Sequence, residues 1–358
     1  MVPLAEACRS QGHHVGFASM DGGEVVANSG FEYVSLAPGV DWRSEIRALG
    51  KNERPELFKR VAESNASDRE AFAGLAGRVN NLVAGAVVDA VARWRPDVII
   101  YEYLFPAALV AAAVLSVPAV QHDLNFVRTP ALRAIMLREM IESLDRYGIA
   151  RPTPVTTLDI APPSMVKETY GWNMRPVPYN GQAALPDLLA VPTERPRVAV
   201  TLGTVLPYQG GPTNIDRIVE AAAEVDAEFV LALGERGVRA LSNTPPNVRI
   251  FGWLPWRQLL NRSQAAIHHG GSSSALCTLD AGIPQIVLPA GSDCFITAHA
   301  VHERGAGLDG TVHPISPSLI KRVLSDTKMA TAARRVRTEI EAMPTPGDIA
   351  SRLAGLAG

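Results

Sequence analysis

The sequence predicts an α/β protein of two doubly wound domains, and three observations support this fold class. Short apolar runs alternate with segments of helical periodicity along most of the chain. At 265–276 an apolar strand enters a His-Gly-Gly-Ser turn that can open a helix, and a second apolar strand follows at 285–289. The chain has 358 residues, which is enough for two domains of ordinary size.

The N-terminal half begins with helical spacing of apolar residues that stops at Gly12, and a strand at 15–18 follows. Segment 42–95 is helical and ends in an almost continuously apolar helix before Pro96. A strand at 97–102, a helix at 106–115 and a strand at 118–121 complete a βαβ pattern. Because a doubly wound domain normally starts with a central strand, we expect that strand upstream of Met1 or lost by truncation.

The second half follows a proline-dense segment at 150–196, which indicates an irregular connection with a domain boundary near residue 190. Strands are expected at 197–204, 228–233 and 248–251, with a helix around 215–225. The His-Gly-Gly-Ser turn comes next. The strict alternation predicts a second Rossmann-like sheet.

The composition points to a small-molecule partner. Formal net charge is −2 and no run of Lys or Arg stands out, which argues against nucleic acid and against a polybasic membrane patch. The three cysteines lie far apart without metal-site spacing, so we expect no disulfide framework and a reducing cytoplasm. No apolar run approaches the roughly 18–20 residues of a membrane span, and no signal peptide is evident.

The turn at 268–274 is the best candidate site. Gly270 and Gly271 let the backbone approach an anion, and the amides that open the following helix point outward toward it. Asp293 follows the next strand, at the edge where open α/β sheets bind ligands. The alternative interpretation is an ordinary turn with a surface His269 and with Asp293 capping a helix.

Four motifs in register carry a resemblance to a known family. They are Gly252-Trp253-Leu254-Pro255, His268-His269-Gly270-Gly271-Ser272, Asp280-Ala281-Gly282-Ile283-Pro284-Gln285 and Asp293-Cys294-Phe295. This half resembles the donor domain of GT-B glycosyltransferases, and more closely the inverting nucleotide-sugar enzymes that decorate macrolide, aromatic polyketide and enediyne antibiotics. Further similar segments are Gly12-His13-His14-Val15, Val177-Pro178-Tyr179-Asn180-Gly181 and Met343-Pro344-Thr345-Pro346.

The resemblance implies a GT-B fold, with two Rossmann-like domains facing across a cleft. Residues 1–190 would bind the acceptor and residues 191–343 the nucleotide-sugar donor, while the C-terminal helix within 344–358 would cross back onto the first domain. It also implies a set of donor-binding residues: Thr204, Trp253, Leu254, His269, Gly270, Gly271, Ser272, Ser273, Ser274 and Asp293.

Individual roles also follow from the resemblance. His269 and the helix amides would hold the diphosphate, Trp253 would pack on the base, although it could instead be core, and Asp293 would accept sugar hydroxyls. Family members commonly carry Gln after that Asp, whereas this chain has Cys294, which favours a deoxysugar. Glu102 would orient a general-base His that we expect upstream of Met1, unless it only caps the next helix.

Three other histidines are weaker candidates for the base. His13 and His14 follow the first helix and fit a solvent-facing position, and His122 at a strand end fits a structural one.

The implied function is inverting transfer of a sugar from a TDP- or UDP-sugar to a hydroxyl of a hydrophobic natural product. Segment 104–165 would supply the apolar acceptor site. We expect no metal or other cofactor, because no carboxylate cluster suited to Mg²⁺ accompanies the motif, and a homodimer is compatible with the sequence.

The sequence leaves two alternative functions. One is a catalytically inactive relative that acts as a partner or activator. The other, a nicotinamide-dependent dehydrogenase, is disfavoured because no Gly-x-Gly-x-x-Gly follows the strands present.

Overall fold

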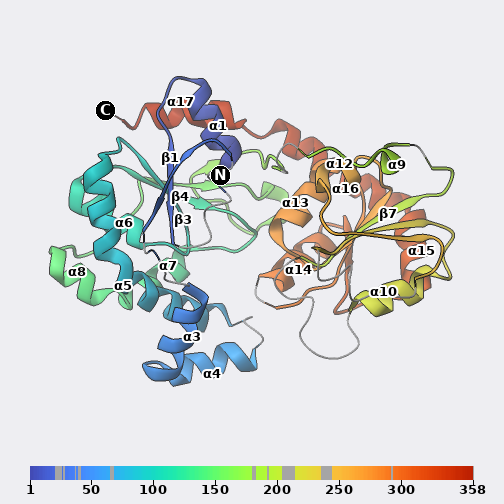
Figure 1. Cartoon of the computed structure of the whole chain (residues 1–358), viewed down its shortest axis with the longest axis horizontal. Coiled ribbons are helices and arrows are strands. Elements are labelled where there is room, and N and C mark those ends of the chain that lie inside the picture. Colours follow the sequence, from blue (N-terminus) through green and yellow to red (C-terminus); the bar gives the residue numbers. More distant parts are fainter. Residues whose placement is uncertain are drawn as a thin grey trace. The chain divides into compact units, whose positions relative to one another are not determined.

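The structure is a computed structural model that describes residues 1–20, 26, 29–36, 38, 42–64, 68–179, 183–191, 193–203, 214–234, 244–291 and 293–357. The chain divides into two compact units, each described by itself below (Figure 1). The first unit comprises Met1–Ile160, Glu168–Arg175 and Met343–Gly358. The second unit comprises Ala161–Lys167 and Pro176–Ala342.

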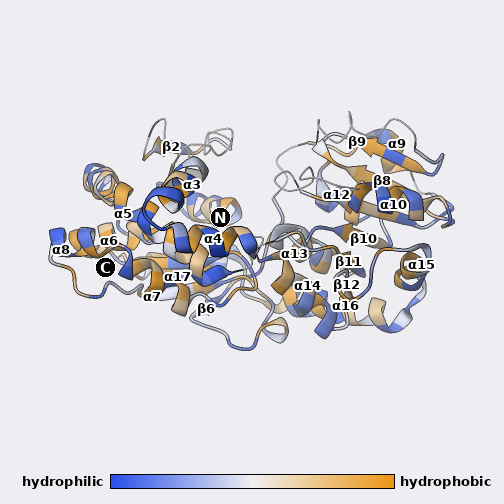
Figure 2. Cartoon of the chain, turned by 90° about the horizontal axis from the view of Figure 1, so that it is seen from below, coloured by the Kyte–Doolittle hydropathy of each residue, from blue (hydrophilic) through white to orange (hydrophobic). Residues whose placement is uncertain are grey.

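The first unit contains two parallel sheets, β1-β2 and β3-β4-β5-β6, with helices packed around them. Its elements are α1 (Val2–Ser10), β1 (Gly16–Ser19), β2 (Glu32–Ser35), α3 (Trp42–Asn52), α4 (Pro55–Glu63), α5 (Arg69–Trp94), β3 (Ile99–Glu102), α6 (Ala107–Leu115), β4 (Ala119–Asp123), α7 (Pro130–Arg138), α8 (Ile141–Tyr147), β5 (Thr156–Asp159), β6 (Trp172–Asn173) and α17 (Pro346–Ala354). The apolar helix α6 is orange along its length in Figure 2, and it packs in one core with α5 and α8. The parallel strands joined by helices confirm the predicted α/β class.

Helix α5 is long and apolar enough to cross a membrane by length and composition, which differs from the expectation that no apolar run approaches that length. The helix has 26 residues, and 72% of its most apolar window is buried inside the protein. A helix that is apolar nearly all round and buried belongs to a protein core.

The proline-dense segment contains regular structure that the sequence did not predict. β5 pairs in parallel with β4, and β6 pairs with β5, so both strands belong to the first unit's sheet. The prolines at 152, 154, 162 and 163 flank β5 and do not interrupt it. Proline density therefore marked the ends of short strands here, since proline is excluded from the middle of a ladder.

The C-terminal helix α17 packs on the first unit. Ile349, Ala350 and Leu353 share a core with Leu4 and Cys8 of α1. A capping box begins this helix: the Thr345 hydroxyl accepts from the Asp348 amide, and the Asp348 carboxylate accepts from the Thr345 amide. Helix α17 is thus fixed against α1.

The second unit contains one six-stranded parallel sheet. Its elements are η1 (Pro163–Met165), α9 (Asp187–Ala190), β7 (Arg197–Thr201), α10 (Asn214–Ala222), β8 (Glu228–Ala232), β9 (Val248–Phe251), α12 (Trp256–Leu260), β10 (Ala265–His268), α13 (Ser272–Ala281), β11 (Gln285–Val287), α14 (Cys294–Glu303), β12 (Gly307–Asp309), α15 (Pro317–Ser325) and α16 (Thr327–Ala342). The strand order is β12-β11-β10-β7-β8-β9. This is the strand order of the Rossmann fold. The order in which successive strands are added reverses at the neighbouring strands β7 and β10.

Both faces of this sheet are covered, as a doubly wound fold requires. Val198 and Val200 of β7 face a core formed with α10, α15 and α16. Ala199, between them, faces the opposite core with α9, α12 and α13. The alternation of side chains along one strand therefore builds two cores.

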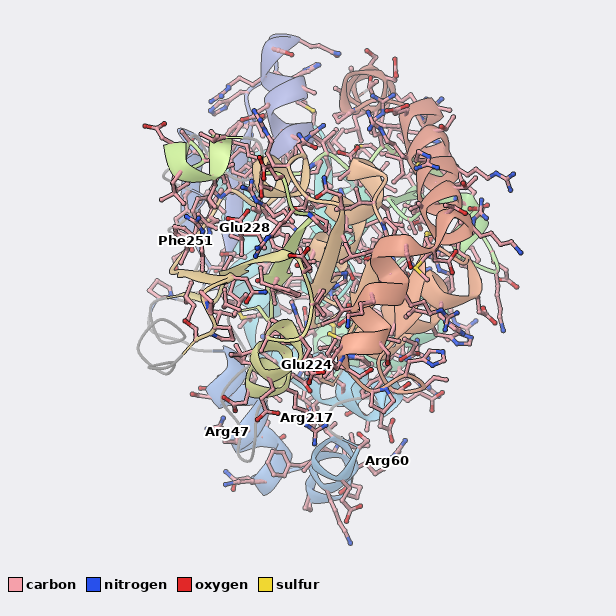
Figure 3. All side chains as sticks on the ribbon, turned by 90° about the vertical axis from the view of Figure 1, so that its right-hand side faces the viewer. Arg47, Arg60, Arg217, Glu224, Glu228 and Phe251 are labelled. Atoms are coloured by element: carbon pink, nitrogen blue, oxygen red, sulfur yellow. The ribbon has the colours of Figure 1, made fainter. Side chains whose placement is uncertain are left out.

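The domain boundary differs from the expected position near residue 190, because the chain from Pro176 to Ala342 already belongs to the second unit, which also includes Ala161–Lys167. Leu189 is fully buried in the second unit's core. Arg197 at the start of β7 is 2% exposed, and its Nη1 donates to the Leu189 carbonyl at 2.7 Å. Its Nε donates at 2.8 Å to Glu228, the first residue of β8, which is labelled in Figure 3. These contacts hold the segment before residue 190 to the second unit.

Candidate functional site

The His-Gly-Gly-Ser turn lies where the strand order reverses. β7 and β10 are adjacent and parallel, so the turns after Thr201 and His268 share the carboxyl edge of the sheet. Open α/β sheets bind ligands at this kind of position. Gly270 adopts φ +93, a backbone conformation that residues with a Cβ rarely accept.

The imidazole of His269 lies against two glycines. A Cβ placed on Gly203 would lie 2.8 Å from both Cε1 and Nε2 of His269. A Cβ placed on Gly271 would lie 2.5 Å from Nε2 and 2.8 Å from Cε1. Only residues without side chains leave room for the ring at these two positions.

Helix α13 starts directly beside this ring. No side chain caps it, and its first backbone bond runs from the Ala275 amide to the Gly271 carbonyl. The amides of Ser272, Ser273 and Ser274 therefore have no partner within the helix, and the helix dipole places partial positive charge there. These three amides are therefore suited to bind an anion. The Gly270 amide differs from them, because it donates to Nδ1 of His268 at 3.1 Å and contributes to the shape of the turn.

His269 is electrically neutral at neutral pH. Burial lowers the pKa of its imidazole, while the Asp293 carboxylate and the Thr201 backbone act in the opposite direction. A neutral imidazole can still donate one N–H to a phosphate oxygen. A bound diphosphate would add negative charge and favour protonation of the ring.

Asp293 is brought to the same place. The Ser272 hydroxyl donates to its Oδ2 at 3.2 Å, so this serine side chain is committed to Asp293 and its backbone amide remains for a ligand. Asp293 precedes α14 but makes no side-chain cap of that helix, which argues against the capping alternative.

Cys294 is 5% exposed, and a Cβ on Gly270 would lie 2.9 Å from its Cβ. Burial, with the neighbouring Asp293 charge, raises the pKa of its thiol to about 11. Cys294 is therefore a neutral packing residue beneath the turn.

The remaining predicted donor-binding residues differ in their exposure. Trp253 is 59% exposed, so it is not the core residue of the alternative interpretation, while Leu254 is 5% exposed and its side chain packs in the core. Only the Leu254 backbone can therefore contact a ligand. Thr204 lies outside the described residues.

Glu102 in the first unit accepts a hydrogen bond from the Leu104 amide at 3.1 Å, so it holds the turn after β3. His122 is 1% exposed, with Nδ1 3.2 Å from the Asp123 carbonyl, and burial with the positive Met1 amino group lowers its pKa to about 3. His14 is exposed and pairs with Glu32. These positions agree with structural or surface roles for both histidines.

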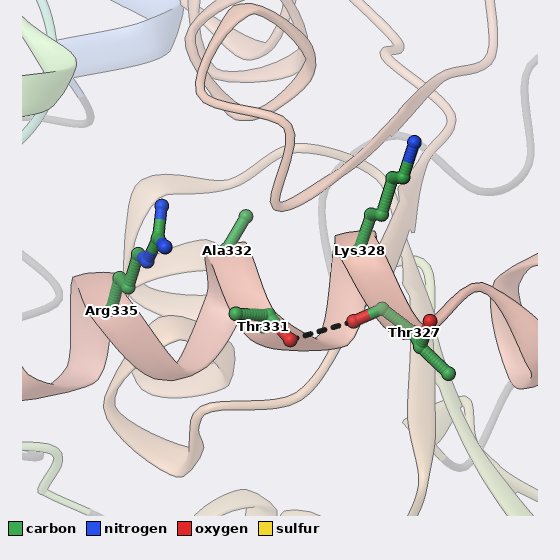
Figure 4. A pocket seen from close by; sticks show the side chains of 5 residues that line it. All are labelled: Thr327, Lys328, Thr331, Ala332 and Arg335. Atoms are coloured by element: carbon green, nitrogen blue, oxygen red, sulfur yellow. Dashed lines mark hydrogen bonds between the residues drawn. The ribbon is translucent and has the colours of Figure 1, made fainter.

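Two other features bear on ligand binding. Among the residues that the structure describes, no group of three or more His, Cys, Asp or Glu side chains could hold a metal ion. Figure 4 shows an open pocket along α16, where the Thr331 hydroxyl donates to the Thr327 carbonyl at 2.7 Å. None of the predicted site residues lines this pocket.

The sequence interpretation missed two residues that shape the site, His268 and Gly203. His268 is fully buried and bonds to Gln285 of β11. A polar residue ending an apolar strand just before a glycine turn was the available signal for it. Gly203 closes the turn after β7, and its role becomes visible only when β7 and β10 are placed side by side.

Comparison with known proteins adds to this geometry. The family models of the erythromycin biosynthesis protein CIII-like N-terminal and C-terminal domains match residues 6–203 and 216–356. The elloramycin glycosyltransferase ElmGT of Streptomyces olivaceus is 35% identical over 98% of this chain and 92% of its own length.

Solved structures of glycosyltransferases are also similar to this chain. The glycosyltransferase SnogD from Streptomyces nogalater is 34% identical, with a TM-score of 0.84 over 100% of this chain and 95% of that one. The spinosyn rhamnosyltransferase SpnG, solved with thymidine diphosphate, is 26% identical with a TM-score of 0.84 over 99% and 95%. The same enzyme solved with the spinosyn aglycone is 27% identical with a TM-score of 0.84 over 99% and 95%.

Proposed function

The chain belongs to the erythromycin biosynthesis protein CIII-like family of antibiotic-tailoring glycosyltransferases, and we propose that it moves a deoxysugar from TDP to a hydroxyl of a hydrophobic natural product. The fold is that of the GT-B glycosyltransferases. TDP is favoured over UDP because a similar enzyme was solved with thymidine diphosphate, and an aglycone acceptor because the same enzyme was solved with one.

One observation carries the donor assignment: a neutral imidazole lies between Gly203 and Gly271, beside the uncapped start of α13. Diphosphate oxygens placed there would receive hydrogen bonds from His269 and from the amides of Ser272–Ser274. Trp253, exposed after β9, would cover the base.

The sugar would extend toward Asp293. This carboxylate accepts hydroxyl hydrogen bonds, whereas Cys294 next to it is buried under the turn and offers the sugar no strong polar group. A sugar with fewer hydroxyls leaves fewer groups without partners, so this pair favours a deoxysugar.

The reaction would be direct displacement with inversion at the anomeric carbon. The acceptor oxygen would attack the anomeric carbon while a general base takes the hydroxyl proton, and the bond from that carbon to the diphosphate would break on the opposite face. The α13 amides and His269 would stabilise the charge that develops on the leaving diphosphate. Independence from metal ions, a role of Glu102 in orienting the base and a cytoplasmic location stay predictions.

The test is transfer by the purified chain. TDP-deoxysugars would be incubated with a panel of polyketide aglycones, and mass spectrometry would detect products heavier by one sugar residue; UDP-sugars are the comparison. Transfer to an aglycone supports the proposal and excludes an inactive partner protein. Binding of TDP without hydrolysis or transfer of any donor would favour the partner hypothesis.

A further inference from the structure

His268 lies directly beneath the diphosphate turn and is fully buried. It ends β10, and its two ring nitrogens face different neighbours. Nδ1 lies 3.1 Å from the amide of Gly270, and Nε2 lies 2.6 Å from Oε1 of Gln285 on β11. The side chain thus connects the turn to the adjacent strand.

The chemistry of these partners fixes the tautomer. The Gly270 amide can only donate, so Nδ1 must be the acceptor and the proton must reside on Nε2. Nε2–H then donates to the Gln285 carbonyl oxygen. Burial also lowers the pKa of His268 to about 4, so the ring is neutral at neutral pH.

The position of the Gly270 amide determines the shape of the turn. Gly270 has φ +93, and its Cα lies against Cys294 so closely that a Cβ there would be 2.9 Å from the Cys294 carbonyl oxygen. Gly271, the next residue, contacts the His269 ring and precedes the first amide of α13. A rotation at Gly270, which lies between them in the chain, would therefore displace His269 relative to the helix amides.

We propose that His268 is a positioning residue for the donor site, which holds the turn through its Nδ1–Gly270 hydrogen bond and is itself oriented by Gln285. It does not touch the diphosphate. This inference rests on the proposed function, because it concerns the site assigned there to TDP.

Asparagine and glutamine separate the two ring nitrogens. In His268→Asn the side-chain oxygen can occupy the position of Nδ1 and accept from the Gly270 amide. In His268→Gln the amide group reaches the position of Nε2 and leaves Gly270 without its acceptor. Loss of a partner for a buried backbone amide is expensive, so we expect TDP affinity about tenfold weaker in His268→Gln and within about threefold of wild type in His268→Asn.

Isothermal titration calorimetry with TDP would measure both variants, and each melting temperature would be recorded alongside. His122→Asn is the matched control, because His122 is equally buried but belongs to the first unit's sheet. Weaker binding by His268→Gln than by His268→Asn at similar melting temperatures supports positioning. Equal affinities for the two, or affinities that only follow the melting temperatures, overturn it.

Nitrogen NMR of ¹⁵N-histidine-labelled wild-type protein gives a second readout that needs neither a variant nor TDP. The expected spectrum has a proton on Nε2 of His268 and none on Nδ1. A protonated Nδ1 overturns the proposal even if neither variant folds. Failure of the wild-type protein to bind TDP would instead contradict the proposed function, and the NMR result would still decide the His268 bonding.

Discussion

His269 is the residue on which the donor assignment depends. We expect His269→Ala to weaken TDP binding by about 1.5–3 kcal/mol, because the lost hydrogen bond is to a charged group. Calorimetry with TDP is the measurement. His299→Ala is the control, since this histidine of α14 is exposed and pairs with Glu303. Unchanged affinity in His269→Ala would place the diphosphate elsewhere.

The two glycines beside His269 provide a separate test. Gly203→Ala and Gly271→Ala should each reduce TDP affinity at least about tenfold, because each new methyl group would overlap the imidazole. Gly234→Ala is the matched control: Gly234 has φ +70, similar to φ +74 at Gly203, but no atom of the residues that the structure describes lies within 4 Å of its Cβ position. If Gly203→Ala and Gly234→Ala weaken TDP binding equally, backbone strain and not contact with His269 explains the loss of affinity.

At the scale of elements, the sequence was most informative where an apolar strand ends in a turn with a specific backbone requirement. The strand at 248–251 and the helix beginning after Gly271 were predicted at their observed positions. β5 was missed because four prolines surround it, although none lies inside it. The contacts of His268 with Gln285 and of Gly203 with His269 could not be derived from local pattern, since they depend on which strands are neighbours.

The pairing of strands also buries a charge that no local pattern predicts. Arg197 and Glu228 begin the adjacent strands β7 and β8, in register. We expect Arg197→Met to destabilise the second unit by about 3–5 kcal/mol, because it leaves Glu228 with only a partly exposed partner, Arg249. Arg249→Ala, which removes a 51% exposed side chain, should cost about 1 kcal/mol or less. Urea unfolding measures the free energy of unfolding of both variants. Similar losses of stability in the two would mean that the buried position of Arg197 is unimportant.

For the whole molecule, each unit carries a buried histidine whose neutral form the native state favours. His122 lies in the sheet of the first unit and His268 in that of the second. Their pKa values are lowered to about 3 and about 4, from 6.5 in the unfolded chain. Asp123 acts in the opposite sense, because burial raises its pKa from 3.8 to about 6.

These shifts predict acid sensitivity. Below about pH 6.5 the unfolded chain binds protons at both histidines, while the native state does not. The stability that both histidines contribute above that pH is therefore lost as pH falls toward about 4. The loss is up to about 1.4 kcal/mol per pH unit for each histidine. The stabilisation from Asp123 is complete below 3.8 and disappears as pH rises through about 6. Because each histidine shift exceeds that of Asp123, the melting temperature should fall between about pH 7 and about pH 5 at constant ionic strength. His268→Asn, which cannot be protonated, should flatten this decline in calorimetric scans. A melting temperature that is constant or rises on acidification would mean that the two histidines are protonated in the native protein.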